Sequence, residues 1–274
     1  MLKQRLITAA VLIPLVVFGI LTLPTDKLNW FVALVSALAA WEWLTMVGVD
    51  DLNRRLLWIL GLFLLSTIVM SSFSLSFILS IAAIVWLLAA FFVAKYRHKG
   101  LPRSLSALFA SKSFGIASCV VLLMFFWVAV VTLHQSSLGP QQLLYVLVSV
   151  WLADTGGYFA GKKWGRTALA KAISPNKTRE GVMGALGLTG VWAIIAYAMS
   201  INGELSLFSW LLLTMITVAI SIIGDLFESL FKRSHQIKDS GNLLPGHGGI
   251  LDRIDSLISA VPMFVVGSMM LGAF

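Results

Sequence analysis

The stretch FGIASCVVLLMFFWVAVVTL, residues 114–133, has no charged side chain and decides the fold class. A bilayer core about 30 Å thick is crossed by a helix of roughly 20 apolar residues, which this stretch supplies. Residues 56–94 are too long for one span, so Ser71 and Ser72 are expected to separate two helices. We therefore predict an all-α integral membrane protein of about nine transmembrane helices, the other eight being Leu6–Leu23, Trp30–Val47, Leu56–Met70, Phe73–Ala94, Leu143–Gly161, Gly181–Ser200, Leu205–Phe231 and Ile254–Leu271.

The composition of the 274 residues supports the same class. Hydrophobic residues make up 59% of the chain and charged residues 12%, whereas soluble domains average roughly 25% charged residues. This excludes a cytosolic globular protein and a disordered chain. The single cysteine, Cys119, lies in an apolar run and excludes a secreted scaffold held by internal disulfides.

The basic residues predict the orientation in the membrane. With nine spans, the N-terminus and the loops after spans two, four, six and eight lie on one side, and they contain every Lys and Arg except Lys27. Loops rich in Lys and Arg remain on the cytoplasmic side. We therefore expect a cytoplasmic N-terminus and an external C-terminus.

Five carboxylates lie within the predicted spans or at the start of the last one: Asp154, Asp225, Glu228, Asp252 and Asp255. A carboxylate in the bilayer centre costs roughly 2.5–3.5 kcal/mol on insertion scales, so each is a candidate functional residue. The last four form two pairs spaced i, i+3, and each pair shares a helix face. We expect the five acids to converge on a polar cavity that faces the cytoplasm. Oxygen-only ligands suit Mg²⁺.

A structural alternative is that these acids form ion pairs with nearby Lys and Arg residues. A sixth acid within a span, Glu42, lies near the cytoplasmic end of the second span, and we expect it to contact a helix end or a basic loop.

Two cytoplasmic loops combine cations with residues that suit anion binding. Residues 174–181 offer two hydroxyls and two cations where a helix begins, and free N–H groups there attract anions. Residues 238–249 place glycines around His247, which lets the backbone approach a ligand closely. Both loops predict phosphate handling, although basic loops also simply follow the positive-inside rule or contact anionic lipid.

The C-terminal half carries a longer signature: SLFKR at residues 229–233, KD at 238–239 and LPGHGGILDRID at 244–255. It resembles the signature of the phosphatidate cytidylyltransferases, also called CDP-diacylglycerol synthases. The stretches 154–158, 174–181 and 224–229 match the same family in order. The resemblance covers the C-terminal half strongly and the N-terminal half in general character. We divide the chain into four N-terminal spans with a basic loop, residues 1–113, and a catalytic region of five spans, residues 114–274.

The resemblance implies an enzyme that makes CDP-diacylglycerol and pyrophosphate from CTP and phosphatidate, requires Mg²⁺ and works as a homodimer without a nucleic-acid partner. Asp225 and Asp252 are the first candidates for Mg²⁺ ligands, with Asp154, Glu228 and Asp255 as further ligands. The other expected catalytic residues are Lys238, Asp239 and His247. The expected substrate-binding residues are Tyr158, Ser174, Lys177, Thr178, Arg179, Lys232, Arg233, Gly248, Gly249 and Arg253.

Two other functions remain open at this stage. A CTP-dependent polyprenol kinase would use an alcohol as nucleophile and would need a general base, a role open to Asp239. A secondary transporter could place carboxylates on an ion path. Transporters commonly bind near the membrane midplane between repeated halves, and no such repeat is visible in this sequence.

Overall fold

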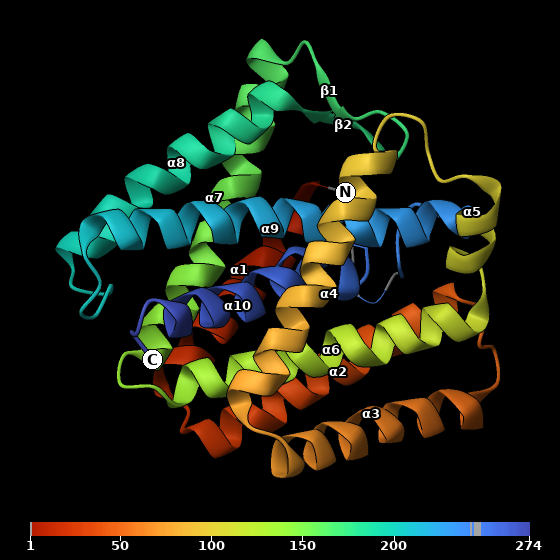
Figure 1. Ribbon diagram of the computed structural model, residues 1–274, viewed down its shortest axis with the longest axis horizontal. Helices are drawn as coiled ribbons and strands as arrows, with labels where there is room; N and C mark the ends of the chain where they lie inside the picture. The colour runs from red at the N-terminus through yellow and green to blue at the C-terminus, as the bar shows by residue number, and fades with distance from the viewer. Residues whose placement is uncertain (1, 242, 244–247) are drawn as a thin grey trace.

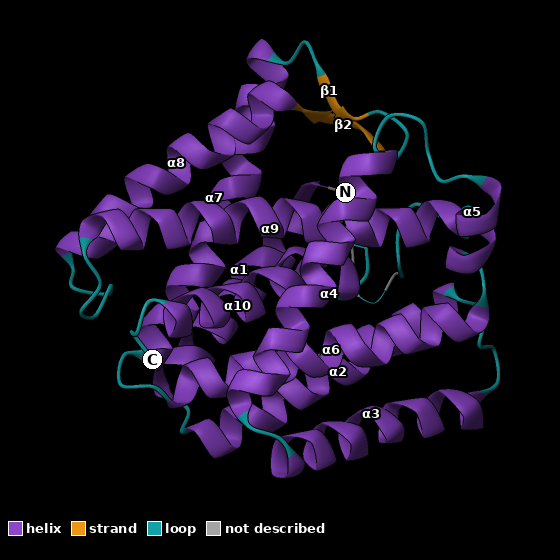
Figure 2. Cartoon of the chain, viewed as in Figure 1, coloured by secondary structure: helices purple, strands orange, loops and turns teal. Residues whose placement is uncertain are grey.

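The computed structural model describes residues 2–241, 243 and 248–274, and they form an almost entirely helical protein (Figures 1 and 2). In chain order the elements are α1 (Leu2–Thr22), α2 (Thr25–Met46), α3 (Leu52–Ser72), α4 (Leu75–Tyr96), α5 (Arg103–Phe109), α6 (Lys112–Gln135), α7 (Gly139–Trp164), β1 (Ala168–Ala170), β2 (Ser174–Thr178), α8 (Arg179–Ala198), α9 (Leu207–Ser234) and α10 (Leu251–Met270).

Each predicted span coincides with a long helix. Among the described residues, eight helices are long and apolar enough to cross a membrane, namely α2, α3, α4 and α6 to α10. The first predicted span corresponds to α1, whose stretch Ala10–Thr22 is a shorter apolar helix. The prediction of an all-α integral membrane protein is confirmed, and the ninth span remains a prediction.

The predicted break between the third and fourth spans is also present. Helix α3 ends at Ser72, and the side chain of Ser74 accepts a hydrogen bond from the N–H of Phe77 at the start of α4. A serine at this position satisfies an N–H that has no partner within the helix. Two spans therefore replace one long helix.

One helix and a two-stranded hairpin arise in loops for which we predicted no regular structure. Helix α5 begins after Pro102, and its buried Phe109 packs against Phe231 of α9, with ring centroids 4.8 Å apart. Strands β1 and β2 pair antiparallel and form a hairpin between α7 and α8. The segment 174–178, expected to be part of a loop, is thus strand β2, and α8 begins directly after it.

Helix α6 packs against α2, α3 and α10, and Figure 1 shows it between α3 and α10. Most of its residues are buried, from Leu122 without interruption to His134. Residues before and after position 113 belong to the same hydrophobic core. The proposed division at residue 113 is therefore one of sequence, and its functional meaning stays a prediction.

Helices α7 and α8 cross closely because glycines face each other where they meet. A Cβ atom added to Gly184 would collide with the Cβ of Ala160, and one added to Gly156 would lie 2.6 Å from the carbonyl oxygen of Gly184. Small residues permit such close backbone contact between membrane helices. The crossing holds the helix that carries Asp154 against the helix that follows Lys177.

We expect Gly184→Ala to destabilise the protein by about 1–3 kcal/mol, the usual cost of overpacking a tight contact. The matched control is Gly187→Ala on the same helix, where an added methyl group meets open space. This control should be neutral or gain up to about 1 kcal/mol from helix propensity. Denaturation midpoints in detergent compare the two variants, and equal midpoints would contradict the packing argument.

Candidate active site

Strand β2 and helices α7 and α9 bring one group of charges together. Lys177 of β2 forms an ion pair with Asp225 of α9. Asp154 of α7 lies close enough to interact electrostatically with both Lys177 and Asp225. Residues that are far apart in sequence therefore meet in one group of charges.

The position of Lys177 depends on the turn from β2 into α8. Thr178 is the N-cap of α8, and its side-chain oxygen accepts a hydrogen bond from the N–H of Gly181, 3.0 Å away. Burial by itself would lower the pKa of Lys177, but Asp225, through charge and a hydrogen bond, and then Asp154 and Asp255 raise the pKa above its ordinary value. Lys177 is therefore an ammonium ion at neutral pH.

Helices α9 and α10 form a second group of charges around Lys232, which is only 8% exposed. Its Nζ lies 3.2 Å from Oε2 of Glu228, one turn earlier on α9, and 3.0 Å from Oδ1 of Asp252 on α10. Asp255 also interacts with Glu228. The sequence left open the alternative that the acids form ion pairs with nearby Lys and Arg. Asp225, Glu228 and Asp252 do form such pairs with lysines.

Asp252 also receives hydrogen bonds from the loop that precedes α10. The backbone N–H groups of Ser240 and Gly249 lie 3.1 Å and 3.0 Å from its Oδ2. Gly248 has φ +79°, a conformation that side chains disfavour, and a Cβ there would lie 3.0 Å from Oδ2. Glycine at these loop positions therefore lets the backbone approach the Asp252 carboxylate.

Glu42 contacts the same loop from α2. Its Oε2 accepts hydrogen bonds from Ser240 Oγ at 3.3 Å and from the N–H of Leu251 at 2.8 Å. The expectation that Glu42 meets a helix end or a basic loop is confirmed, because it meets both.

The remaining predicted residues occupy more peripheral positions. Arg233 donates hydrogen bonds to the carbonyl oxygens of Ile173 and Ile237, at 3.2 Å and 3.3 Å, and so ties the hairpin to α9. Tyr158 is exposed on α7, with Lys162 Nζ 5.7 Å from its ring centroid. Arg253 interacts electrostatically with Asp154.

Three further predicted residues, Arg179, Lys238 and Asp239, are exposed, and Ser174 is partly buried in β2. His247 lies outside the described residues.

The donor chemistry of the site suits a hard cation. The five predicted acids supply only oxygen ligands, and Oε1 of Glu228 is buried without a hydrogen-bond partner in the described part of the chain. Within that same part, no group of three or more His, Cys, Asp or Glu side chains is already arranged to hold a metal. The carboxylate oxygens therefore suit a hard divalent cation. In this arrangement the ammonium groups of Lys177 and Lys232 pair with those carboxylates.

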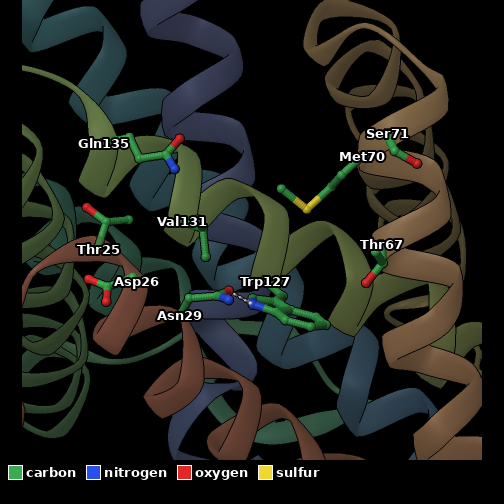
Figure 3. Close-up of a pocket in the computed structure, with 9 residues that line it drawn as sticks. All are labelled: Thr25, Asp26, Asn29, Thr67, Met70, Ser71, Trp127, Val131 and Gln135. Carbon is green, nitrogen blue, oxygen red and sulfur yellow. Dashed lines mark hydrogen bonds between the residues drawn. The ribbon is translucent and has the colours of Figure 1, made fainter.

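The chain also contains a cavity of about 530 Å³ that includes none of the predicted site residues. In this cavity Asn29 accepts a hydrogen bond from Trp127 at 2.7 Å, and Asp26 and Gln135 also line the wall (Figure 3). Thr25 in its wall precedes Glu42 by 17 residues on α2, about 25 Å at 1.5 Å per residue. The cavity therefore lies at the opposite end of α2 from the acids.

A smaller cavity of about 370 Å³ lies beside the hairpin and is lined by Lys163, Trp164, Gly165, Arg166 and Glu180.

The sequence profile of the Cytidylyltransferase family matches residues 3–270. The chain belongs to this family. A phosphatidate cytidylyltransferase of Pseudomonas aeruginosa is 37% identical over 265 residues, 96% of each chain. A phosphatidate cytidylyltransferase of Haemophilus influenzae is 48% identical over 134 residues, which are 48% of this chain and 46% of the relative. One from Staphylococcus saprophyticus is 40% identical over 151 residues, 54% of this chain and 56% of the relative.

The motifs located the acids and lysines of this candidate site but missed two features that position them. The hairpin was missed because strands of three and five residues leave little periodicity in the sequence. The role of Glu42 in holding the loop before α10 depends on a contact between residues about 200 positions apart. Its only sequence signal was a carboxylate inside an apolar span.

We expect Lys232→Met to destabilise the protein by about 3–5 kcal/mol, because it leaves Glu228 and Asp252 buried without their shared cation. Lys171→Met is the control, since Lys171 is exposed and a change there should remain within about 0.5 kcal/mol. Denaturation midpoints in detergent test the difference. A Lys232→Met protein as stable as the control would show that the buried ion pairs do not hold α9 and α10 together.

Proposed function

We propose that this protein transfers CMP from CTP to phosphatidate, which yields CDP-diacylglycerol and pyrophosphate. The observation that carries the proposal is the similarity to a phosphatidate cytidylyltransferase over 96% of both chains. The cluster of acids and lysines at α7, β2, α9 and α10 supports it, because the reaction joins two highly charged anions.

The chemistry needs little proton transfer. A phosphomonoester has a second pKa near 6, so the phosphate of phosphatidate is largely a dianion at neutral pH. One of its oxygens attacks the α-phosphorus of CTP, a new P–O bond forms, and the bond from the α-phosphorus to the pyrophosphate oxygen breaks. The difficulty lies in positioning the two anions and neutralising their charge.

The lysines of this site suit that task. Lys177 and Arg179, with the hydroxyls of Ser174 and Thr178, would hold the phosphates of CTP. Lys232, Arg233, Lys238 and Arg253 would neutralise phosphatidate or the departing pyrophosphate. Lys177 and Lys232 are each paired with carboxylates, so an arriving phosphate would compete with those carboxylates for the ammonium groups.

Mg²⁺, when bound, would neutralise phosphate charge and help to align the reacting groups. Asp225 and Asp252 would be its first ligands, and Asp154, Glu228 and Asp255 would be further ligands. The buried oxygen of Glu228 that has no hydrogen-bond partner among the described residues supports this assignment.

The proposed substrates fit a site at the cytoplasmic surface of a bacterial inner membrane. CTP arrives from the cytosol, whereas the phosphate of phosphatidate lies at the headgroup level, so the two can meet only near the interface. We propose a cytoplasmic N-terminus and an external C-terminus, supported by the bias of Lys and Arg toward one side. The homodimer remains a prediction from the family resemblance.

We expect the purified protein in detergent, with labelled CTP and Mg²⁺, to release pyrophosphate when phosphatidate is present. With a polyprenol in its place, no product should form. Release of CDP with the polyprenol would instead identify a CTP-dependent kinase. If neither phosphatidate nor the polyprenol gives a product, that result would contradict both enzyme assignments and favour the transporter.

We expect Asp252→Asn to lower turnover at saturating Mg²⁺ at least about 100-fold, the size of effect seen when a key electrostatic group is removed. Its thermal midpoint should show that the protein remains folded. Asp26→Asn, an identical change at an exposed residue in the distant cavity, should retain normal turnover. Near-normal turnover of Asp252→Asn would rule out Asp252 as a metal ligand.

A further inference from the structure

Glu42 of α2 is a buried carboxylate, 3% exposed, in a segment outside every motif that points to the site. We propose that Glu42 is a positioning residue for the cytidylyl transfer: it holds the loop before α10 so that the loop fixes the carboxylate of Asp252. The expected effect of Glu42 on turnover rests on the proposed function, whereas the hydrogen bonds of Glu42 do not depend on which reaction the protein catalyses.

The first observation is that Glu42 caps α10 from another helix. The residue before α10, Ile250, provides no side-chain cap, and the free N–H of Leu251 donates instead to Oε2 of Glu42 at 2.8 Å. The first N–H groups of a helix have no partner within the helix and carry partial positive charge. A carboxylate from α2 thus satisfies the first turn of the helix that carries Asp252.

The second observation is that one loop residue joins the two acids. Ser240 donates its hydroxyl to Oε2 of Glu42 at 3.3 Å, and its backbone N–H to the carboxylate of Asp252 at 3.1 Å. Ser240 is itself buried, 6% exposed. If Glu42 holds Ser240 in place, the N–H of Ser240 holds Asp252.

The third observation is that two described loop residues beside Glu42, Gly241 and Gly249, are glycines. A Cβ added to Gly241 would lie 2.5 Å from Oε1 of Glu42, and one added to Gly249 would collide with Ser240 Oγ and Oε2 of Glu42. Neither glycine has a positive φ. Space beside the Glu42 carboxylate, and not backbone conformation, therefore requires glycine here.

The fourth observation is that the position of Glu42 is itself fixed. The neighbouring residue Trp43 is 1% exposed and packs against Phe231 of α9, with ring centroids 5.2 Å apart. Phe231 precedes Lys232, which pairs with Asp252. Trp43 of α2 therefore contacts α9 at the residue next to the one that supplies the cation of the site.

The test compares Glu42→Leu, which has similar volume but no acceptor, with Glu42→Gln, which keeps an oxygen for Ser240 and Leu251. Ser36→Ala is the control, because Ser36 is also buried on α2 but has no hydrogen-bond partner in the described structure. The first measurement is the Mg²⁺ concentration for half-maximal turnover. Glu42→Leu should raise it about 10–100-fold, as loss of a group that orients a metal ligand does, with Glu42→Gln and Ser36→Ala close to the unmodified chain.

The second measurement does not depend on turnover. A spin label on Leu243→Cys reports the mobility of the loop, since Leu243 is 48% exposed whereas the native Cys119 is buried. We expect the label to become more mobile in Glu42→Leu and to stay unchanged in Glu42→Gln and Ser36→Ala. If the unmodified chain lacks transferase activity, the proposed function fails, and the spin label still decides the role of Glu42.

A structural role alone would lower the yield of folded Glu42→Leu protein without changing its Mg²⁺ requirement or the mobility of the label, and that result would overturn the proposal. If Glu42→Leu does not fold, Ser240→Ala replaces it, since it removes the hydroxyl bonded to Glu42 and keeps the N–H bonded to Asp252. Ser240→Ala should increase the mobility of the label, and an unchanged label would again overturn the proposal.

Discussion

The arrangement of α9 and α10 depends on one buried ammonium group between two carboxylates. Lys232 contacts Glu228 and Asp252 at 3.2 Å and 3.0 Å, and all three come from helices that are largely apolar. Carboxylates in such surroundings are costly unless they are paired and hydrogen-bonded. The cation therefore sets how α9 meets α10, and it fixes the position from which Asp252 faces the loop and the rest of the site. Lys177, on strand β2, pairs with Asp225 of α9 from outside the helices.

The sequence predicted the spans well because the lipid bilayer requires about 20 apolar residues in each spanning helix, however the helices pack together. It also predicted which acids gather, since pairs spaced i, i+3 had to share a helix face whatever the packing. The other contacts depend on a residue's neighbours in space. Nothing in the sequence of the 238–249 loop shows that Ser240 and Gly249 lie against a glutamate on α2. In the same way, the sequence around Arg233 does not show that this side chain binds the carbonyl oxygen of Ile173. Helix α5 was missed for the same reason, because its seven residues gain stability from Phe109 packing against Phe231 and not from a strong local pattern.

The contacts of Glu42 also change the meaning of the N-terminal spans. A division into residues 1–113 and 114–274 follows the motifs, all of which lie after residue 113. Yet α2 supplies the cap of α10, and α4 packs against both α9 and α10. An N-terminal segment that served only as a lipid-facing wall would have no need for a buried carboxylate at a helix terminus. The family signature and the residues that hold it in place are thus separated in sequence but joined in the core.

The local charges explain how the same site could favour two anions and a cation together. Five carboxylates, Asp154, Asp225, Glu228, Asp252 and Asp255, interact with three cations, Lys177, Lys232 and Arg253. The carboxylates in this group therefore outnumber the cations that face them. Electrostatic interactions strengthen where water is excluded, so this balance matters more here than on an exposed surface. A phosphate that draws Lys177 or Lys232 away from its carboxylate partners would leave those carboxylates without a counter-charge, and a metal cation would then bind them more favourably. The binding of substrate and that of the ion would then favour each other, since each satisfies charges that the other exposes.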